Sequence, residues 1–300
     1  MLCGLPGSGK TTLALEMKKE FGFEVYSSDA LREELYGDVN CQDHNQEVFK
    51  ELHQRIKRDL KEGKSCIYDA TNMSKKYRIS FLRDLQDIEC NKYCFVLISP
   101  IAICKERNNA RSRSVPEEVY DKMLRSFWIP EKYEGWDRIY FLSDKNILQS
   151  YQLEMEKAYG FDQRNSHHTK NLFDHMCGAC QYIIKNFDGN RNTAKYMSLL
   201  RAAMFHDIGK LYTQSFKDTN GNSTEEAHYY GHENYGAYLY LLQEMYGGMN
   251  DIYAAWLINW HMRPIIWSKS EKARNRDKTL IGEERYKDLM MLHEADLYAR

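Results

Sequence analysis

The sequence has few prolines, almost no net charge and no long apolar run. Only 5 of its 300 residues are proline, and the formal net charge is -1. A charge this small excludes a globally cationic nucleic-acid binder, so contacts with nucleic acid must come from local patches. No run of about 18 apolar residues is present, which excludes a transmembrane helix and predicts a protein that does not act in a membrane.

The cysteines form no disulfide framework. The eight cysteines show no regular spacing, and a glycine-rich motif begins as early as Gly4, so no signal peptide is expected. Reduced thiols in a cytoplasmic protein are therefore predicted. Cys177 and Cys180 form one C-x-x-C pair without the second pair that a structural zinc site needs, and a buried pair of thiols is expected.

Length and composition indicate two domains, because 300 residues is about twice a typical domain. Residues 1–145 alternate short apolar runs with helical patterns, which predicts an α/β domain with a parallel sheet and helices on both faces. Residues 146–165 are predicted to be a linker. Residues 166–300 show helical periodicity, which predicts an all-α domain, and eight of the ten histidines lie from His167 onward.

The periodicity also places individual elements. The first expected strand is shorter than a central strand normally needs, so either another strand completes that edge or residues are missing upstream. Two polar stretches, 217–227 and 268–279, are predicted to be exposed loops. The expected strands are Met1–Cys3, Glu24–Ser27, Ser65–Tyr68, Tyr93–Ile98 and Arg138–Leu142. The expected helices are Lys10–Glu20, Ala30–Leu35, Asn45–Glu62, Lys76–Leu85, Pro116–Arg125, Leu172–Asn186, Thr193–Phe205, Asn234–Tyr246, Asp251–His261 and Gly282–Ala299.

The segment GLPGSGKT (4–11) fits the phosphate-binding loop pattern G-x-x-x-x-G-K-[ST] between a predicted strand and a predicted helix. Its glycines let consecutive backbone N–H groups point at a phosphate, and the helix N-terminus adds a positive dipole. Lys10 is predicted to reach the β- and γ-phosphates of ATP, and the Thr11 hydroxyl to hold Mg²⁺. The predicted ATP-binding residues here are Gly4, Gly7, Ser8, Gly9, Lys10, Thr11 and Thr12.

Charged residues follow the predicted strands, at the sheet edge where ligands bind in open α/β sheets. Asp29 could accept a proton from an attacking hydroxyl, and Arg32 could hold an anionic group of the acceptor. Asp69 ends the third predicted strand. Arg107 and Arg111 are one helical turn apart and could close on a phosphate together. Each could instead be an ordinary solvated charge.

The first domain resembles the phage-type 5′-hydroxyl polynucleotide kinases and, more distantly, P-loop kinases of the zeta-toxin kind. This resemblance implies that Asp29 is the general base on a 5′-hydroxyl end and that Arg32 contacts the acceptor phosphate. It also implies that Asp69 orients or supports the acceptor side and that Arg111 stabilises the transferring phosphoryl group. The matching motifs are GLPGSGKT (4–11), S-D-x-x-R (28–32), D-A-T-N (69–72) followed by Arg78, and R-N-x-x-R (107–111) leading to Val115-Pro116.

Histidine and aspartate residues of the second half could hold metal ions. Imidazole and carboxylate groups suit Mn, Fe, Co, Ni or Zn. Six candidates exceed what one tetrahedral ion needs, so two ions bridged by Asp207 are predicted, an arrangement that activates water for phosphoester hydrolysis. The candidate ligands are His175, His206, Asp207, His232, His261 and Asp296.

The ordered pattern H…HD…H…H…D, with the segments F-H-D-I-G-K and Y-G-H-E-x-x-G-A, resembles the HD-domain metal-dependent phosphohydrolases. The resemblance implies that these six residues are the ligands and that Lys210 contacts the scissile phosphate. His228 stays an alternative ligand. His167 and His168 could contact substrate or lie at the surface.

The two halves together resemble fusions of a polynucleotide kinase with an HD phosphohydrolase. This resemblance implies a bifunctional repair enzyme for nucleic-acid ends, RNA rather than DNA, with an RNA ligase as a pathway partner and an open oligomeric state. One alternative is a small-molecule kinase fused to a nucleotide phosphohydrolase, and another is a nucleotide-sensing regulator. The arginines favour a polyanionic acceptor. The basic residues of 268–279 could form a nucleic-acid patch or a solvated loop.

Overall fold

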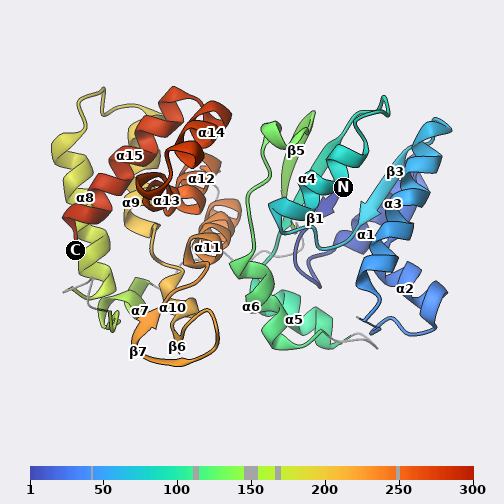
Figure 1. The fold of residues 1–300 in the computed structure, drawn as a ribbon, viewed down its shortest axis with the longest axis horizontal. Coiled ribbons are helices and arrows are strands. Elements are labelled where there is room, and N and C mark those ends of the chain that lie inside the picture. The colour runs from blue at the N-terminus through green and yellow to red at the C-terminus, as the bar shows by residue number, and fades with distance from the viewer. Residues whose placement is uncertain (42, 111–114, 145–154, 166–169, 248–250) are drawn as a thin grey trace. The chain divides into compact units, whose positions relative to one another are not determined.

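The computed structural model describes residues 1–41, 43–110, 115–144, 155–165, 170–247 and 251–300 (Figure 1). The chain divides into two compact units. Unit 1 comprises residues 1–123 and 130–149, and unit 2 comprises residues 124–129 and 150–300. In the part of the chain that the structure describes, no helix combines the length and the apolar character needed to cross a membrane.

Unit 1 is built on a five-stranded parallel sheet, which confirms the predicted α/β class. The strand order is β2-β3-β1-β4-β5. The strands are β1 (Leu2–Cys3), β2 (Glu24–Ser27), β3 (Cys66–Asp69), β4 (Tyr93–Ile98) and β5 (Arg138–Ser143). The helices are α1 (Lys10–Phe21), α2 (Ser28–Tyr36), α3 (Asn45–Lys61), α4 (Lys75–Asp84), α5 (Ile101–Asn109) and α6 (Glu117–Arg125), with a short 3-10 helix η1 (Lys132–Glu134).

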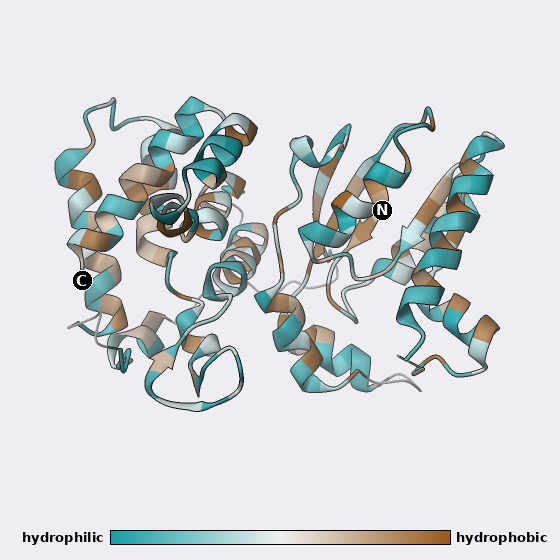
Figure 2. Ribbon diagram, viewed as in Figure 1, coloured by the Kyte–Doolittle hydropathy of each residue, from teal (hydrophilic) through white to brown (hydrophobic). Residues whose placement is uncertain are grey.

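Helices cover both faces of this sheet. Successive strand residues point to opposite faces. In β3, Ile67 packs with Ala14 of α1, whereas the next residue, Tyr68, packs with Leu52 of α3. Helix α3 accordingly alternates hydrophilic and hydrophobic bands in Figure 2, as expected for a helix with one buried side.

The short first strand lies in the centre of the sheet rather than at an edge. β1 pairs with β3 on one side and with β4 on the other. The backbone of Met1 extends the pairing, since its carbonyl accepts from the Phe95 N–H at 3.0 Å. The phosphate-loop segment therefore leaves the sheet from its middle, where both neighbouring strands end nearby.

A buried ion pair stabilises unit 1. The Arg78 guanidinium donates two hydrogen bonds to Glu134, at 2.8 and 2.7 Å, and neither side chain is exposed to solvent. Arg78 also donates to the backbone carbonyls of Asn72 and Met73. Arg78, which follows the D-A-T-N segment (69–72), thus makes structural contacts within unit 1.

Glu134→Ala is expected to lower the free energy of unfolding of unit 1 by about 3–5 kcal/mol, because it leaves the guanidinium buried without its counter-charge. Urea denaturation followed by far-UV circular dichroism measures this. Glu24, whose half-exposed carboxylate lies 3.7 Å from Lys18, provides the control. Glu24→Ala is expected to change stability by less than about 1 kcal/mol, and equal transitions for the two variants would contradict the account.

Among its described residues, unit 2 is helical apart from the hairpin of β6 and β7, which corrects the all-α prediction. Residues 217–227, expected as a loop, lie within the antiparallel pair β6 (Ser215–Lys217) and β7 (Ser223–His228). Asp218 closes the turn by accepting from the backbone N–H groups of Asn220 and Asn222. The helices are α7 (Met155–Tyr159), α8 (Leu172–Asn186), α9 (Ala194–Phe205), α10 (Lys210–Thr213), α11 (His232–Gly247), α12 (Ile252–Trp260), α13 (Arg263–Lys269), α14 (Glu271–Ile281) and α15 (Glu283–Tyr298).

The predicted loop 268–279 is also wrong, because most of it belongs to α14. Ser270 caps this helix by accepting from the Ala273 N–H, and Glu271 places an acidic group in the first turn. Asp277 is buried and accepts hydrogen bonds from Arg263 and Arg276. These contacts explain why the segment forms a helix although most of its side chains are polar.

The boundary between the two units is more complex than a single linker. Residues 124–129 pack within unit 2, where the Ile129 N–H donates to Asn259 at 2.9 Å and the Phe127 ring meets Tyr238 edge-on. The first part of the predicted linker 146–165 falls in 145–154, outside the described residues. Its second part contains α7, whose Ala158 is buried, so this part belongs to unit 2.

Candidate phosphate loop and candidate metal centre

The segment between β1 and α1 forms a glycine-dependent loop. Gly7 and Gly9 have φ values of +79° and +94°, a conformation that residues with a Cβ rarely adopt. A Cβ on Gly7 would also lie 2.2 Å from the carbonyl oxygen of Cys104. Lys10 is buried, and its ammonium donates to the carbonyl of Leu5 at 2.8 Å. The side chain of Lys10 therefore lies against the backbone of the loop.

Thr11 and Asp69 meet beside this loop. The Thr11 hydroxyl donates to Asp69 Oδ2 at 2.8 Å, and Asp69 is buried at the end of β3. A loop hydroxyl next to a strand carboxylate is the pair that holds Mg²⁺ in P-loop enzymes. The contact brings Asp69 next to the hydroxyl that is predicted to hold Mg²⁺, and its role on the acceptor side stays a prediction.

Asp29 and Arg32 lie one turn apart on α2. Ser27 caps this helix by accepting from the backbone N–H of Asp29, which leaves the Asp29 carboxylate exposed in the first turn. The buried Arg32 donates to Asp29 Oδ1 at 2.9 Å and to Asn45 Oδ1 at 2.7 Å. Arg32 thus fixes the orientation of the Asp29 carboxylate, and Asn45 is a contributor that the sequence analysis missed.

The arginine segment is described only in part. Arg107, near the end of α5, forms an ion pair with Asp144 at 2.6 Å. Arg111 and Arg113 lie outside the described residues, so the predicted pairing of Arg107 with Arg111 stays a prediction.

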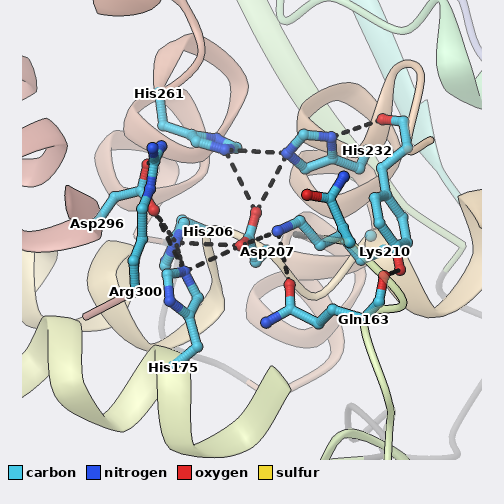
Figure 3. A network of polar contacts seen from close by, with 12 residues as sticks. Gln163, His175, His206, Asp207, Lys210, His232, His261, Asp296 and Arg300 are labelled. Carbon is cyan, nitrogen blue, oxygen red and sulfur yellow. Dashed lines mark hydrogen bonds and ion pairs between the residues drawn. The ribbon is translucent and has the colours of Figure 1, made fainter. Parts of the chain in front are cut away.

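In unit 2, the six candidate metal ligands converge in a buried cluster (Figure 3). Asp207 lies at its centre and faces two groups. Its Oδ2 atom lies 3.2 Å from His175 Nε2 and 3.5 Å from His206 Nε2. Its Oδ1 atom lies 3.2 Å from His232 Nε2 and 3.6 Å from His261 Nε2. Asp296 of α15 joins the first group, 3.3 Å from His175.

Within each group the ligand atoms lie within 4.8 Å of one another. The five chain segments that supply them are distant in sequence. Adjacent His206 and Asp207 both reach the cluster because α9 ends at Phe205 and the chain turns there. The two groups share Asp207, so the geometry fits two ions with one bridging carboxylate.

The ring orientations support a metal site. In His206, His232 and His261 the Nδ1 atom lies 2.7–2.9 Å from a backbone carbonyl oxygen. A carbonyl only accepts, so Nδ1 carries a proton, and Nε2 of each ring is the atom that faces the cluster. The Nε2 atoms of His232 and His261 are 3.2 Å apart. A cation could be held by both of them and by Asp207.

The carboxylates of the cluster remain ionised. Burial alone would raise the pKa of Asp296, but its contact with His175 outweighs this and holds the pKa below its usual range. Burial lowers the pKa of His206 to about 4, which keeps that imidazole neutral at pH 7. Burial also lowers the pKa of His175, but its contacts with Asp207 and Asp296 raise it to about 9. The cluster thus holds two carboxylates that neighbouring cationic groups stabilise in their ionised form.

A pocket of about 280 Å³ opens onto this cluster, with Asp207, His232 and Asp296 among its lining residues. Two cations line it as well. Lys210 is buried, 2.7 Å from Asp207 Oδ2, and donates to Gln163 at 2.9 Å. Arg300 lies 3.4 Å from Asp296 Oδ2. The sequence named Lys210 only through resemblance, and it missed both Gln163 and Arg300, which no motif marks.

Other sequence candidates lie elsewhere. His228 ends β7 and stacks on Tyr230 rather than joining either ligand group. Cys177 and Cys180 are half-buried thiols, not the fully buried pair expected. His167 and His168 lie outside the described residues.

Comparisons with known proteins give two similarities. Residues 1–130 match a family model described as an AAA domain. Protein kti12 of Schizosaccharomyces pombe is 21% identical to the chain over 150 residues, which cover 46% of this chain and 53% of that protein. The matching stretch thus spans about half the length of that relative.

Residues 1–130 form a P-loop, kinase-like domain. This domain contains the glycine loop, the Thr11–Asp69 contact and the Asp29–Arg32 pair. A P-loop kinase-like domain implies binding of ATP and Mg²⁺. The family match ends before the metal cluster, whose interpretation rests on its own geometry.

Proposed function

We propose that the protein heals broken nucleic-acid ends with two active sites. The P-loop kinase-like domain phosphorylates a 5′-hydroxyl end with ATP. An HD-type phosphohydrolase in unit 2 removes a 2′,3′-cyclic phosphate or a terminal 2′- or 3′-phosphate. The observation that carries the proposal is the pair of ligand groups sharing Asp207 beside a cation-lined pocket. The two activities together make an end suitable for an RNA ligase, and we propose RNA ends in the cytoplasm as the natural substrate.

In the kinase site, each residue contributes a defined interaction. Lys10 contacts the β- and γ-phosphates, and Thr11 and Asp69 would hold Mg²⁺, which neutralises phosphate charge when bound. The 5′ oxygen bonds to the γ-phosphorus as the bond to the β,γ-bridging oxygen breaks and ADP leaves. Asp29 takes the proton of the hydroxyl. We retain Arg111 as the proposed contact to the transferring phosphoryl group.

In the hydrolase site, two divalent transition ions such as Mn, Fe, Co, Ni or Zn would be held by the six clustered residues. When bound, these ions activate water and stabilise the leaving oxygen. Lys210 and Arg300 bind the phosphate oxygens from the pocket. Gln163 accepts from Lys210 and so keeps that ammonium aimed at the cluster. Hydrolysis of a terminal 2′- or 3′-phosphate breaks one P–O bond, water supplies the new oxygen, and the ribose oxygen leaves with a proton. Release of phosphate from a 2′,3′-cyclic end takes two such hydrolyses, of which the first opens the ring and leaves a terminal monophosphate.

Asp29→Asn is expected to slow phosphoryl transfer to a 5′-hydroxyl end by about 100-fold or more, because the amide cannot take the proton. Binding of an ATP analogue should change little, since Asp29 lies away from the glycine loop along the chain. Single-turnover transfer rates and equilibrium titrations measure the two effects. Glu33→Gln, an exposed neighbour on the same helix, is the control. Equal loss in both variants would contradict the assignment of Asp29 as base.

The hydrolase half is tested with the metal-stripped full chain and a short RNA bearing a 2′,3′-cyclic phosphate. Release of phosphate is expected only after Mn²⁺, Co²⁺, Ni²⁺ or Zn²⁺ is restored, at about two ions per chain. Full activity of the stripped protein in the presence of a chelator would contradict the proposal. If free nucleotides are hydrolysed while RNA ends are not, unit 2 is the nucleotide phosphohydrolase of the alternative function.

A further inference from the structure

The lining of the pocket in unit 2 combines charged and aromatic groups. The charged groups Lys210 and Arg300 line it together with His228 and Tyr230. The rings of His228 and Tyr230 stack, with centroids 5.4 Å apart and planes 10° apart. Tyr230 keeps 42% of its surface exposed, so a ligand can reach part of this stacked pair.

The turn that carries Tyr230 is fixed by its backbone. The Tyr230 carbonyl accepts from Arg125 at 3.0 Å. At the next residue, Gly231 has a φ of +75°, and a Cβ there would lie 2.6 Å from the Arg125 carbonyl oxygen. Asn234 donates to that same carbonyl at 2.7 Å. These contacts hold the backbone of the turn, and the stacking of the Tyr230 ring on His228 positions its side chain.

The same turn positions the metal cluster. The carbonyl of Tyr229 accepts from His232 Nδ1 at 2.7 Å, and Tyr230 is the following residue. The Tyr229 hydroxyl donates to the backbone of Gln163, whose side chain holds Lys210. The segment 228–232 thus connects the His228–Tyr230 pair with the candidate ligand His232 and, through Gln163, with Lys210.

We infer that the His228–Tyr230 pair is a stacking surface for a nucleobase, so that the hydrolase site takes a single terminal nucleotide rather than a bare phosphate ester. The inference rests on the proposed hydrolase function and adds the recognition of its substrate. Flat aromatic faces stack with any base and give about 1–3 kcal/mol per base. A volume of about 280 Å³ lies near the lower end for ligand pockets, which suits one nucleotide.

The test measures binding as well as activity. Isothermal titration calorimetry on the Mn²⁺-loaded full chain compares uridine 3′-monophosphate with ribose 5-phosphate, which lacks a base. The Lys10→Ala background removes the phosphate contact of the kinase site. We expect the nucleotide to bind about 5-fold or more tightly than the sugar phosphate, the factor that corresponds to about 1 kcal/mol of stacking.

Tyr230→Ala should remove most of this preference, and Tyr230→Trp should retain it. Tyr77→Ala, which removes an exposed tyrosine of unit 1, is the matched control and should leave the preference intact. A preference for the nucleotide that survives Tyr230→Ala would overturn the inference, and so would equal binding of the two ligands by the Lys10→Ala parent.

Phosphate release from a 2′,3′-cyclic end separates the two possible failures. If Lys10→Ala protein with native Tyr230 releases phosphate but shows no base-dependent binding, the stacking surface is wrong and the hydrolase function stands. If it binds the nucleotide through Tyr230 but releases no phosphate with any metal, the hydrolase function fails and the stacking surface stands.

Discussion

Asp207→Ala is expected to reduce phosphate release from a 2′,3′-cyclic end by at least about 100-fold while the transfer of phosphate to a 5′-hydroxyl continues. Asp207 is the one carboxylate shared by both ligand groups, so its loss weakens both ions together. Substitutions of residues that merely support metal ligands cost about 10–100-fold, and a bridging ligand should cost more. Metal content should fall below the two ions per chain expected of the unaltered protein.

The measurement pairs a radiolabelled phosphate-release assay with elemental analysis of the dialysed protein. Asp218→Ala is the control, because Asp218 lies in the exposed β6–β7 turn. Circular dichroism verifies that each variant folds. If Asp207→Ala retained two tightly bound ions and normal hydrolysis, the bridging role would be wrong.

Lys10→Ala should have the opposite effect. Phosphoryl transfer is expected to fall by at least about 100-fold, because removal of one aligned donor from a charged transition state costs about 100- to 1000-fold. Lys10 lies folded over the glycine loop, where its ammonium donates to the Leu5 carbonyl, next to the expected position of the phosphates. Hydrolysis of a 2′,3′-cyclic end should continue at its normal rate.

Transfer of labelled phosphate from ATP measures this effect, with Lys18→Ala as a control from the exposed side of the same helix. The two variants Lys10→Ala and Asp207→Ala together test whether the sites are independent. A single substitution that abolished both activities in a folded protein would argue for one shared site.

Much of unit 1 can be predicted from local signals. The alternation of apolar runs and helical patterns locates the five strands to within about a residue, because buried parallel strands require short apolar runs. The phosphate-loop motif can be identified from the sequence alone, because the positive φ values of the loop at Gly7 and Gly9 require glycine. The central position of β1 could not be predicted, because strand order depends on pairing between distant segments.

The sequence singles out the residues of the candidate metal cluster but not their arrangement in space. The order of histidines and aspartates names the six residues. Their division into two groups around Asp207 depends on how five separate segments pack, which sequence spacing does not encode. Arg300 and Gln163 carry no motif, so only the folded structure places them beside the cluster.

A strongly polar stretch does not have to be a loop. The stretch 268–279 is highly charged, yet α14 forms because Ser270 caps it and Asp277 accepts hydrogen bonds from Arg263 and Arg276. The contact between Thr11 and Asp69 could not be predicted either, since the two residues lie 58 positions apart in the sequence.

The most direct test uses one RNA with both kinds of broken end. A short oligonucleotide with a 5′-hydroxyl and a 2′,3′-cyclic phosphate is incubated with labelled ATP and Mg²⁺, with and without Mn²⁺, Co²⁺ or Ni²⁺, and both ends are followed. The account predicts that the 5′ end gains a phosphate and the 3′ end loses one. If neither end changes while ATP or free nucleotides are consumed, the end-healing function is contradicted and the acceptor is a small molecule.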